Sequence, residues 1–139
     1  MEPDEEMNDL TGRVIGAAIE IHRALGPGYQ ESIYEEALAF ELGRMGIGFE
    51  RQHAFAVKYH GHVVGEGRID FLIEGKLVVE LKAVEKMHPV HKAQVISYLK
   101  AISCQMGLLI NFNESMLRSG IQRIIYTDPL CVSAPLRLF

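Results

Sequence analysis

Two acids and a lysine lie among apolar residues in the segment GRIDFLIEGKLVVELKA, at positions 67–83. They are Asp70, Glu80 and Lys82. Charged side chains are seldom buried unless they are paired or bind a metal ion. Two carboxylates about 6 Å apart repel each other by roughly 3 kcal/mol at an effective dielectric constant of about 20, and a bound cation turns that cost into attraction. Because hard oxygen ligands suit Mg²⁺ or Mn²⁺, the segment is a candidate metal site.

The same segment has the pattern of two strands joined by a turn at Gly75. Side chains alternate along a strand, so Asp70 can share one face with Glu80 and Lys82. A solvated outer face is the ordinary explanation for such charges, but apolar residues share this face and the charges gather at one end. The opposite face is apolar throughout. We expect it to pack against a helix through Ile69, Phe71, Leu77, Val79 and Leu81.

The length of the turn decides whether the two acids can meet. A two-residue turn would send the side chains of Asp70 and Glu80 to opposite faces of the sheet. A three-residue loop at positions 73–75 would instead place Asp70 opposite Val78 and make the two acids diagonal neighbours, about 7 Å apart. Gly75 would then take the left-handed conformation that such a loop needs. We predict the three-residue loop.

The charged residues also resemble a known nuclease signature. Asp70 and, on the following strand, Glu80-Leu81-Lys82 are similar to the PD-(D/E)XK signature, with isoleucine where the name has proline. The sequence GYQESIY, at positions 28–34, resembles the motif that names the GxxExxY family, a branch assigned to that superfamily. The sequence QVISY resembles the Q-x-x-x-Y helix motif of the exonuclease-like branch. Together the matches cover most of the chain.

This resemblance implies the roles of the residues at the metal site. Asp70, Glu80 and the main-chain carbonyl of Leu81 would hold Mg²⁺ or Mn²⁺. Glu31, from an early helix, would complete the ligand set. Lys82 would position or activate the attacking water and offset the charge that develops on the phosphate.

Four further residues are candidates for contacts with the substrate, and each has an alternative role. Gln94 and Tyr98 are four residues apart on a predicted helix, so they face the same way, and such polar pairs are usually surface residues. The resemblance instead gives Gln94 a catalytic role and Tyr98 a substrate contact. Tyr34 is either a substrate contact or a core ring with a hydrogen-bonded hydroxyl. His91 is a candidate for a phosphate contact, with a surface or capping role as the alternative. Glu31 could also simply favour the helix dipole.

The pattern of the whole chain predicts the elements that must position these residues. Asn8 is a candidate N-cap for a first helix, which the sequence GPG ends at positions 26–28. The order is ααβββαββ, a mixed α/β sheet flanked by helices, and the resemblance implies a restriction-endonuclease-like core. We expect helices within 8–25, 30–46 and 88–103, a three-strand meander within 49–84, and two more strands within 106–112 and 121–127.

Composition favours one globular domain over residues 1–139, with residues 1–7 expected to be frayed. The chain has 48% hydrophobic and 23% charged residues and a net charge of −4, so it has no global basic field for nucleic acid or a membrane. Cys104 and Cys131 lack metal-type spacing, and the acidic start is unlike a signal peptide, so we expect a cytoplasmic protein without a membrane span. The candidates for a local basic track are Arg51, Lys58, Lys86, Lys92 and Lys100.

These observations favour a metal-dependent nuclease that hydrolyses the phosphodiester bonds of nucleic acid, with DNA favoured over RNA. The alternatives are a catalytically silent nucleic-acid-binding module and an accessory subunit of a larger nucleic-acid-processing complex. Retention of both acids and the lysine argues for the enzyme. The acidic net charge and the small size argue for the alternatives.

Overall fold

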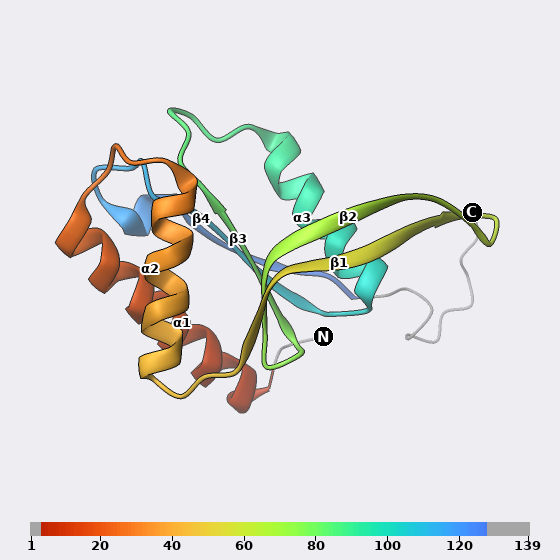
Figure 1. Cartoon of the computed structure of the whole chain (residues 1–139), viewed down its shortest axis with the longest axis horizontal. Helices are drawn as coiled ribbons and strands as arrows, with labels where there is room; N and C mark the ends of the chain where they lie inside the picture. Colours follow the sequence, from red (N-terminus) through yellow and green to blue (C-terminus); the bar gives the residue numbers. More distant parts are fainter. Residues whose placement is uncertain (1–3, 128–139) are drawn as a thin grey trace.

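The structure is a computed structural model that describes residues 4–127 (Figure 1). The predicted order ααβββαββ is confirmed, with one short 3₁₀ helix, η1, before the last strand. Its elements are α1 (Glu5–Leu25), α2 (Glu31–Arg44), β1 (Phe49–Tyr59), β2 (His62–Ile73), β3 (Leu77–Lys82), α3 (Pro89–Ile102), β4 (Met106–Asn111), η1 (Leu117–Gly120) and β5 (Ile121–Ile125). The segment 128–139 lies outside the described residues.

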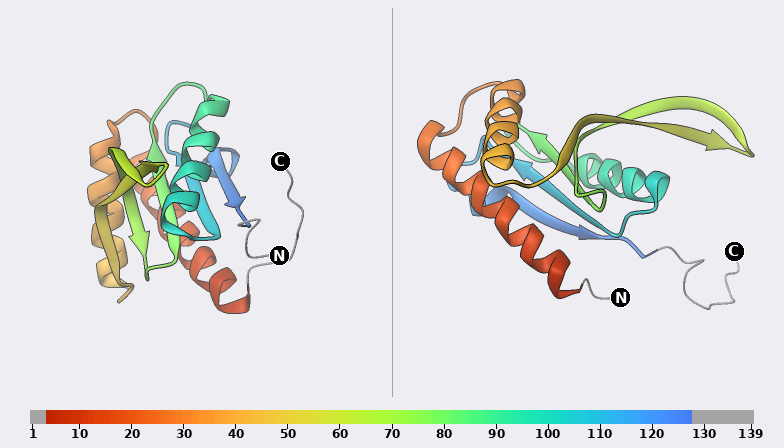
Figure 2. Two further views of the ribbon diagram at one scale, coloured as in Figure 1. Left: turned by 90° about the vertical axis from the view of Figure 1, so that its right-hand side faces the viewer. Right: turned by 60° about the horizontal axis from the view of Figure 1, so that its bottom comes forward.

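The strands form one mixed sheet in the order β1-β2-β3-β4-β5. Strands β3 and β4 are parallel and are joined through α3, whereas the other neighbours are antiparallel. Helices α1 and α2 cover one face of the sheet and α3 covers the other (Figure 2). Both faces of the central strands are therefore buried, which explains why β3 and β4 read as nearly continuous apolar runs.

Helix α1 begins earlier than the sequence indicated. Asp4 is the N-cap, and its Oδ1 accepts a hydrogen bond from the Met7 N–H at 2.8 Å. Glu5 and Glu6 occupy the first turn, where their negative charge favours the helix dipole. The prediction that Asn8 is the cap was therefore wrong, because the helix already includes residues 5–7. The expected fraying of residues 1–7 stays a prediction. The acidic run itself was the start signal.

The loop between β2 and β3 has the predicted three residues but lies one residue further along the chain, so the pairing register differs from the predicted one by two residues. The ladder pairs are Phe71 with Val79, Leu72 with Val78 and Ile73 with Leu77, so the loop is 74–76. The two-residue shift preserves the alternation of the side chains. Extended by one pair, the ladder would set Asp70 opposite Glu80 rather than diagonal to it.

The contacts of Glu74 explain the shift. Glu74 and Gly75 have φ values of 54° and 69°, so two successive residues take the left-handed conformation. A non-glycine residue is strained there. Gly48 stabilises this conformation, because its N–H donates to Glu74 Oε2 at 2.7 Å and its carbonyl accepts from the Glu74 N–H at 2.9 Å. These contacts lie 26 residues apart in the sequence, beyond the reach of turn rules.

The outer part of the β1–β2 hairpin extends beyond the sheet as an arm (Figure 2). Strand β2 pairs with β3 only over residues 71–73, and the rest of its length pairs with β1 alone. Helix α3 runs alongside this arm, and Phe55 of β1 packs with the core cluster under α3. No helix within residues 4–127 is long and apolar enough to cross a membrane.

The side chains of β2 change the side of the sheet to which they point near Asp70. Phe71, as predicted, and Ile73, which the predicted loop contained, pack with α1 and α2, whereas Ile69 packs with Leu72 in the cluster under α3. Residues 69 and 71 would share a face in a regular strand. The predicted apolar face is therefore correct for Phe71, Leu77, Val79 and Leu81 and wrong for Ile69.

Candidate metal and substrate site

The two acids lie where β2 and β3 separate. Beyond the last ladder pair, each carboxylate accepts a hydrogen bond from a main-chain N–H of the other strand. The Asp70 N–H donates to Glu80 Oε1 at 2.8 Å, and the Leu81 N–H donates to Asp70 Oδ2 at 2.8 Å. The opening of the sheet thus brings both acids to one point and anchors one oxygen of each on the main chain.

Burial makes this group of acids electrostatically unfavourable in its charged form. Glu80 is only 5% exposed, and burial together with the charge of Asp70 raises the pKa of Glu80 to about 8. Burial likewise raises the pKa of Asp70, although the Leu81 N–H and Gln52 oppose the rise. The pKa of Glu31 is also raised by burial. Three carboxyl groups, one each from α2, β2 and β3, would therefore be stabilised in their charged form by a nearby positive charge.

Lys82 lies two residues after Glu80 on β3, so the two side chains share a face of the strand. Its positive charge opposes the rise in pKa of Glu31, Asp70 and Glu80. The Lys82 carbonyl accepts from the Phe112 N–H at 2.8 Å, which fixes the main chain of the lysine against the end of β4. Within residues 4–127, Lys82 makes no direct ion pair, so its ammonium group remains available beside the acids.

The motif at positions 28–34 is a locked turn at the start of α2. Gly28 has a φ of 110°, which favours glycine, and Glu31 is the first residue of the helix. The Tyr34 hydroxyl donates to the Gly26 carbonyl at 2.6 Å and accepts from the Tyr29 N–H at 3.2 Å. The tyrosine thereby closes the turn that positions Glu31.

Tyr34 itself lies in the core. Its side chain is fully buried and stacks on Phe112, with ring centroids 4.4 Å apart. The core alternative therefore describes this residue, and its hydroxyl is committed to the turn rather than to a substrate. Sequence alone left the two roles open because a tyrosine one turn into a helix suits both.

The residues on α3 differ in how they relate to the acids. Tyr98 is half-buried, and burial, then Glu80 and Asp70, raise its pKa to about 12, so its hydroxyl lies within the field of the acids. His91 lies close enough to Lys82 for that charge, after burial, to lower its pKa. Gln94 is exposed.

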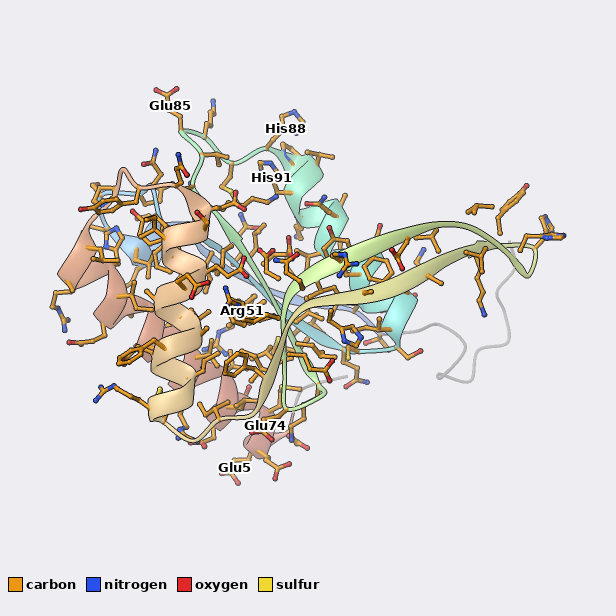
Figure 3. All side chains as sticks on the ribbon, viewed as in Figure 1. Glu5, Arg51, Glu74, Glu85, His88 and His91 are labelled. Atoms are coloured by element: carbon orange, nitrogen blue, oxygen red, sulfur yellow. The ribbon has the colours of Figure 1, made fainter. Side chains whose placement is uncertain are left out.

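His91 is also part of the cap of α3. Its Nδ1 accepts a hydrogen bond from the His88 N–H at 3.2 Å, and His88 Nδ1 accepts from the Val90 N–H at 3.1 Å. Figure 3 shows both histidines at the start of α3, at the opposite end of the molecule from the turn that carries Glu74. The capping alternative for His91 is thus observed, and the same ring borders the site.

A groove leads along the arm beside α3. Its volume is about 620 Å³, and its lining includes Phe55, Lys58, Tyr98 and Lys100. The rings of Phe55 and Tyr98 meet edge to face, with centroids 5.2 Å apart. Two of the five residues proposed as a basic track therefore line one groove that starts near the acids.

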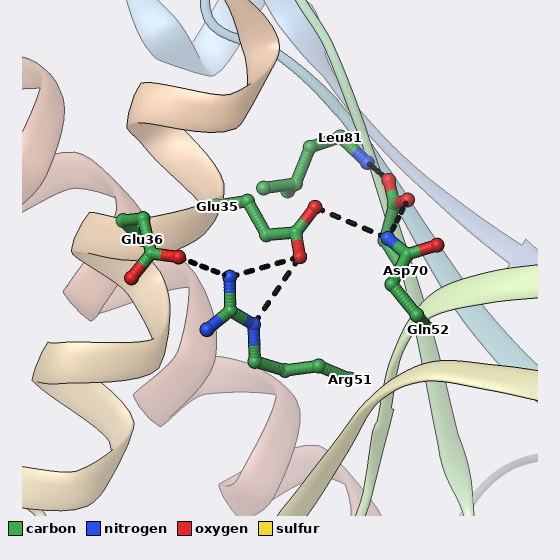
Figure 4. A network of polar contacts seen from close by, with 6 residues as sticks. All are labelled: Glu35, Glu36, Arg51, Gln52, Asp70 and Leu81. Atoms are coloured by element: carbon green, nitrogen blue, oxygen red, sulfur yellow. Dashed lines mark hydrogen bonds and ion pairs between the residues drawn. The ribbon is translucent and has the colours of Figure 1, made fainter.

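Arg51 does not belong to that track. Its guanidinium forms ion pairs with Glu35 at 3.0 Å and with Glu36 at 2.7 Å. These contacts tie β1 to α2 (Figure 4). The cationic side chain is thus used inside the fold.

Three residues near the acids were not identified from the sequence. Gln52 and Glu35 belong to the network in Figure 4, which reaches Asp70. Asn111 is fully buried, and its amide bonds both the N–H and the carbonyl of Val84, just beyond Lys82. Glu35 carried a usable signal, because it lies four residues after Glu31 on the same helix face. Gln52 and Asn111 carried none, since neither belongs to a recognisable local pattern.

The donor set fits a divalent cation in its chemistry. Asp70, Glu80 and Glu31 offer carboxylate oxygens, which are the ligands that Mg²⁺ prefers, and burial disfavours the charged form of each of them. Within the described part of the chain, no three His, Cys, Asp or Glu side chains form a ready-made metal-binding group. Hydrogen bonds already engage both oxygens of Asp70 and one oxygen of Glu80.

A mixed sheet flanked by helices, with two acids and a lysine where an antiparallel pair opens, defines a nuclease-like α/β domain. The sequence model of the PD-(D/E)XK nuclease superfamily matches residues 8–124, and the chain belongs to this superfamily. No curated protein matches the chain. Among solved structures, the one titled "Crystal structure of SSO0001" has a similar fold, with a TM-score of 0.53 and 24% sequence identity. The match covers 68% of this chain and 48% of that protein, so this chain spans about half of its length.

Proposed function

We propose that the protein is a nuclease of the GxxExxY branch that hydrolyses phosphodiester bonds with Mg²⁺ or Mn²⁺. The observation that carries the proposal is the meeting of Asp70 and Glu80 at the opening between β2 and β3. Superfamily membership gives this pair of acids its chemical interpretation. The branch assignment rests on Gly28, Glu31 and Tyr34, which together form the locked turn at the start of α2.

In this proposal, Asp70, Glu80 and the main chain of Leu81 hold the ion, with Glu31 facing them from α2. The ion, when bound, polarises a phosphoryl oxygen and lowers the pKa of a water molecule. Lys82 places its ammonium group beside the acids, where it stabilises negative charge on the phosphate and orients the water.

The substrate class is nucleic acid, with DNA favoured over RNA and the cytoplasm as the expected location. Lys58 and Lys100 supply positive charge along the groove, and Phe55 and Tyr98 supply aromatic surface there. Gln94 lies one turn before Tyr98 on α3, so the two side chains share a helix face. We assign Tyr98, Gln94 and His91 to the substrate side of the site, and we leave Tyr34 in the core.

The test is cleavage of labelled single- and double-stranded DNA and RNA by the purified protein with Mg²⁺, Mn²⁺ or EDTA. We expect metal-dependent cleavage that Glu80→Gln and Lys82→Ala each reduce by at least about 100-fold. Lys76→Ala is the matched control. Lys76 lies at the far end of the same hairpin and pairs with the exposed Glu6 at 3.0 Å, so its loss should leave cleavage unchanged.

Each outcome bears on a different part of the proposal. Cleavage that persists in EDTA would refute the metal requirement. Cleavage that persists in both Glu80→Gln and Lys82→Ala would refute the assigned site. Binding of an oligonucleotide by a wild-type protein that cleaves none of the four substrates would favour the silent binding module over the enzyme.

A further inference from the structure

Gln52 has an unusual backbone conformation in the middle of β1. Its φ is 50°, although it is neither glycine nor part of a turn. The ladder pairs residue 51 with 71 and residue 53 with 69, and it omits the pair between Gln52 and Asp70. A left-handed non-glycine residue inside a strand is strained, and such strain persists only where the surrounding contacts maintain it.

The left-handed residue changes where its neighbours point. In a regular strand, Arg51 and Gln52 would point to opposite faces. Here both side chains reach Glu35: Arg51 donates to its Oε2 and Gln52 donates to its Oε1 at 3.1 Å (Figure 4). On the partner strand, the faces also turn over at Asp70, as the separate packing of residues 69 and 71 shows.

The amide of Gln52 bridges two acids from different elements. Its Nε2 donates to Glu35 Oε1 on α2 and to Asp70 Oδ1 on β2, the latter at 3.2 Å. The carbonyl that the ladder leaves unused accepts from Arg68 Nη1 at 3.2 Å, so the irregular peptide is held on both sides. Because the other Asp70 oxygen accepts from the Leu81 N–H, the carboxylate is fixed at both oxygens.

The bridge also relates Asp70 to the helix that carries Glu31. Glu35 and Glu31 are four residues apart on α2 and therefore lie on the same helix face. The chain of contacts from Asp70 through Gln52 to Glu35 continues to Arg51 and Glu36, so it spans from β2 to α2 without a break. A shift of the amide would move Asp70 relative to that helix face.

We propose that Gln52 is a positioning residue of the site: its left-handed backbone aims the side-chain amide between Glu35 and Asp70, and so fixes the Asp70 carboxylate relative to the Glu31 face of α2. The inference rests on the proposed function, because Asp70 and Glu31 are ligands there. Residues that orient metal ligands typically change metal affinity by about 10- to 100-fold when they are lost.

Two variants separate the backbone from the amide. Gln52→Gly keeps the left-handed conformation without strain and removes the amide. Gln52→Met keeps the length of the side chain and removes only the donor. The matched control is His60→Gly, because His60 has a φ of 52° in the turn at the tip of the arm, away from the acids.

The first measurement needs no metal ion. Amide hydrogen exchange at Leu81, relative to that at Val79 in the same strand, reports whether Asp70 still holds the Leu81 N–H. We expect faster relative exchange in Gln52→Gly and Gln52→Met and none of this change in His60→Gly. Unchanged relative exchange in both Gln52 variants would overturn the inference.

The second measurement is titration with Mn²⁺ by calorimetry. We expect an affinity at least about ten-fold weaker in both Gln52 variants, including Gln52→Gly, whose relaxed backbone should keep its thermal stability at or near the wild-type level. Wild-type affinity in both variants would overturn the inference and leave the proposed function intact. If the wild-type protein binds no Mn²⁺, the proposed metal site is refuted. If Leu81 exchange is nevertheless faster in the Gln52 variants, the inference that Gln52 positions Asp70 still holds.

Discussion

Substitution of Glu80 by glutamine should make the protein more stable at neutral pH in the absence of divalent metal. Burial and the Asp70 charge raise the pKa of Glu80 from 4.5 to about 8. A carboxyl whose pKa is higher in the folded state binds its proton more tightly there. Its contribution to stability is therefore complete below pH 4.5 and is lost as the pH rises through about 8. Glutamine keeps the shape and the acceptor for the Asp70 N–H but carries no charge.

The magnitude follows from the two pKa values. With 4.5 for the unfolded chain and about 8 for the folded protein, the linkage relation gives a loss of about 2–3 kcal/mol in the unfolding free energy between pH 5 and pH 7. Such a loss is a large part of the stability of a typical small domain, which is about 5–15 kcal/mol. The Glu80→Gln variant lacks this contribution, so its stability should vary less over the same interval.

The assay is urea unfolding in EDTA at pH 5, 6, 7 and 8. Glu66→Gln is the matched control, because Glu66 is exposed on the arm. We expect the wild type and the control to lose stability in parallel as the pH rises, and Glu80→Gln to exceed both at pH 8. Added Mn²⁺ at pH 7 should stabilise the wild type more than Glu80→Gln, because an ion that binds only the folded state shifts the equilibrium toward it. The same pH dependence in wild type and Glu80→Gln would refute the assignment of a raised pKa to this residue.

Two further substitutions test the packing that supports the site. Gly67→Ala should destabilise the protein by about 1–3 kcal/mol in urea unfolding, because a Cβ there would lie 2.3 Å from the Phe55 ring. Gly65→Ala is the control and should destabilise it less, because its Cβ would meet no atom within 4 Å. Tyr34→Phe should cost about 1–2 kcal/mol in the same assay, since it leaves the part-buried Gly26 carbonyl without its hydroxyl donor. A wild-type stability would show that the turn before α2 does not depend on this bond.

The alternation of side chains predicted the most important feature of the site. Asp70 and Glu80 could share a face only if the turn preserved the even spacing between them, and the observed pairing of Leu72 with Val78 preserves it. The exact position of the loop was predicted incorrectly because the left-handed conformation of Glu74 depends on Gly48. Local turn preferences contain no information about such a partner.

The site beyond the motif was less predictable for a similar reason. Glu31 begins a helix that periodicity could locate; Glu35 was not identified, although its spacing of four residues from Glu31 places both on one helix face. The role of Gln52 depends on a backbone conformation that propensity disfavours and that distant contacts impose. Sequence patterns describe what is locally favourable, so they miss the places where tertiary contacts override the local preference.

The opening of the sheet explains why acids in particular occupy it. Where β2 and β3 separate, the N–H groups of Asp70 and Leu81 have no backbone partner across the gap in the described part of the chain, and buried main-chain donors need acceptors. A carboxylate from each strand supplies one to the other strand, which holds the pair together without a metal ion. Within residues 4–127 no donor contacts the second oxygen of Glu80, so the bond that stabilises the opening leaves one oxygen for a ligand. The same two residues can therefore hold the strands together and act as metal ligands in the proposed function. The raised pKa of Glu80 reflects the burial of its carboxyl beside that of Asp70.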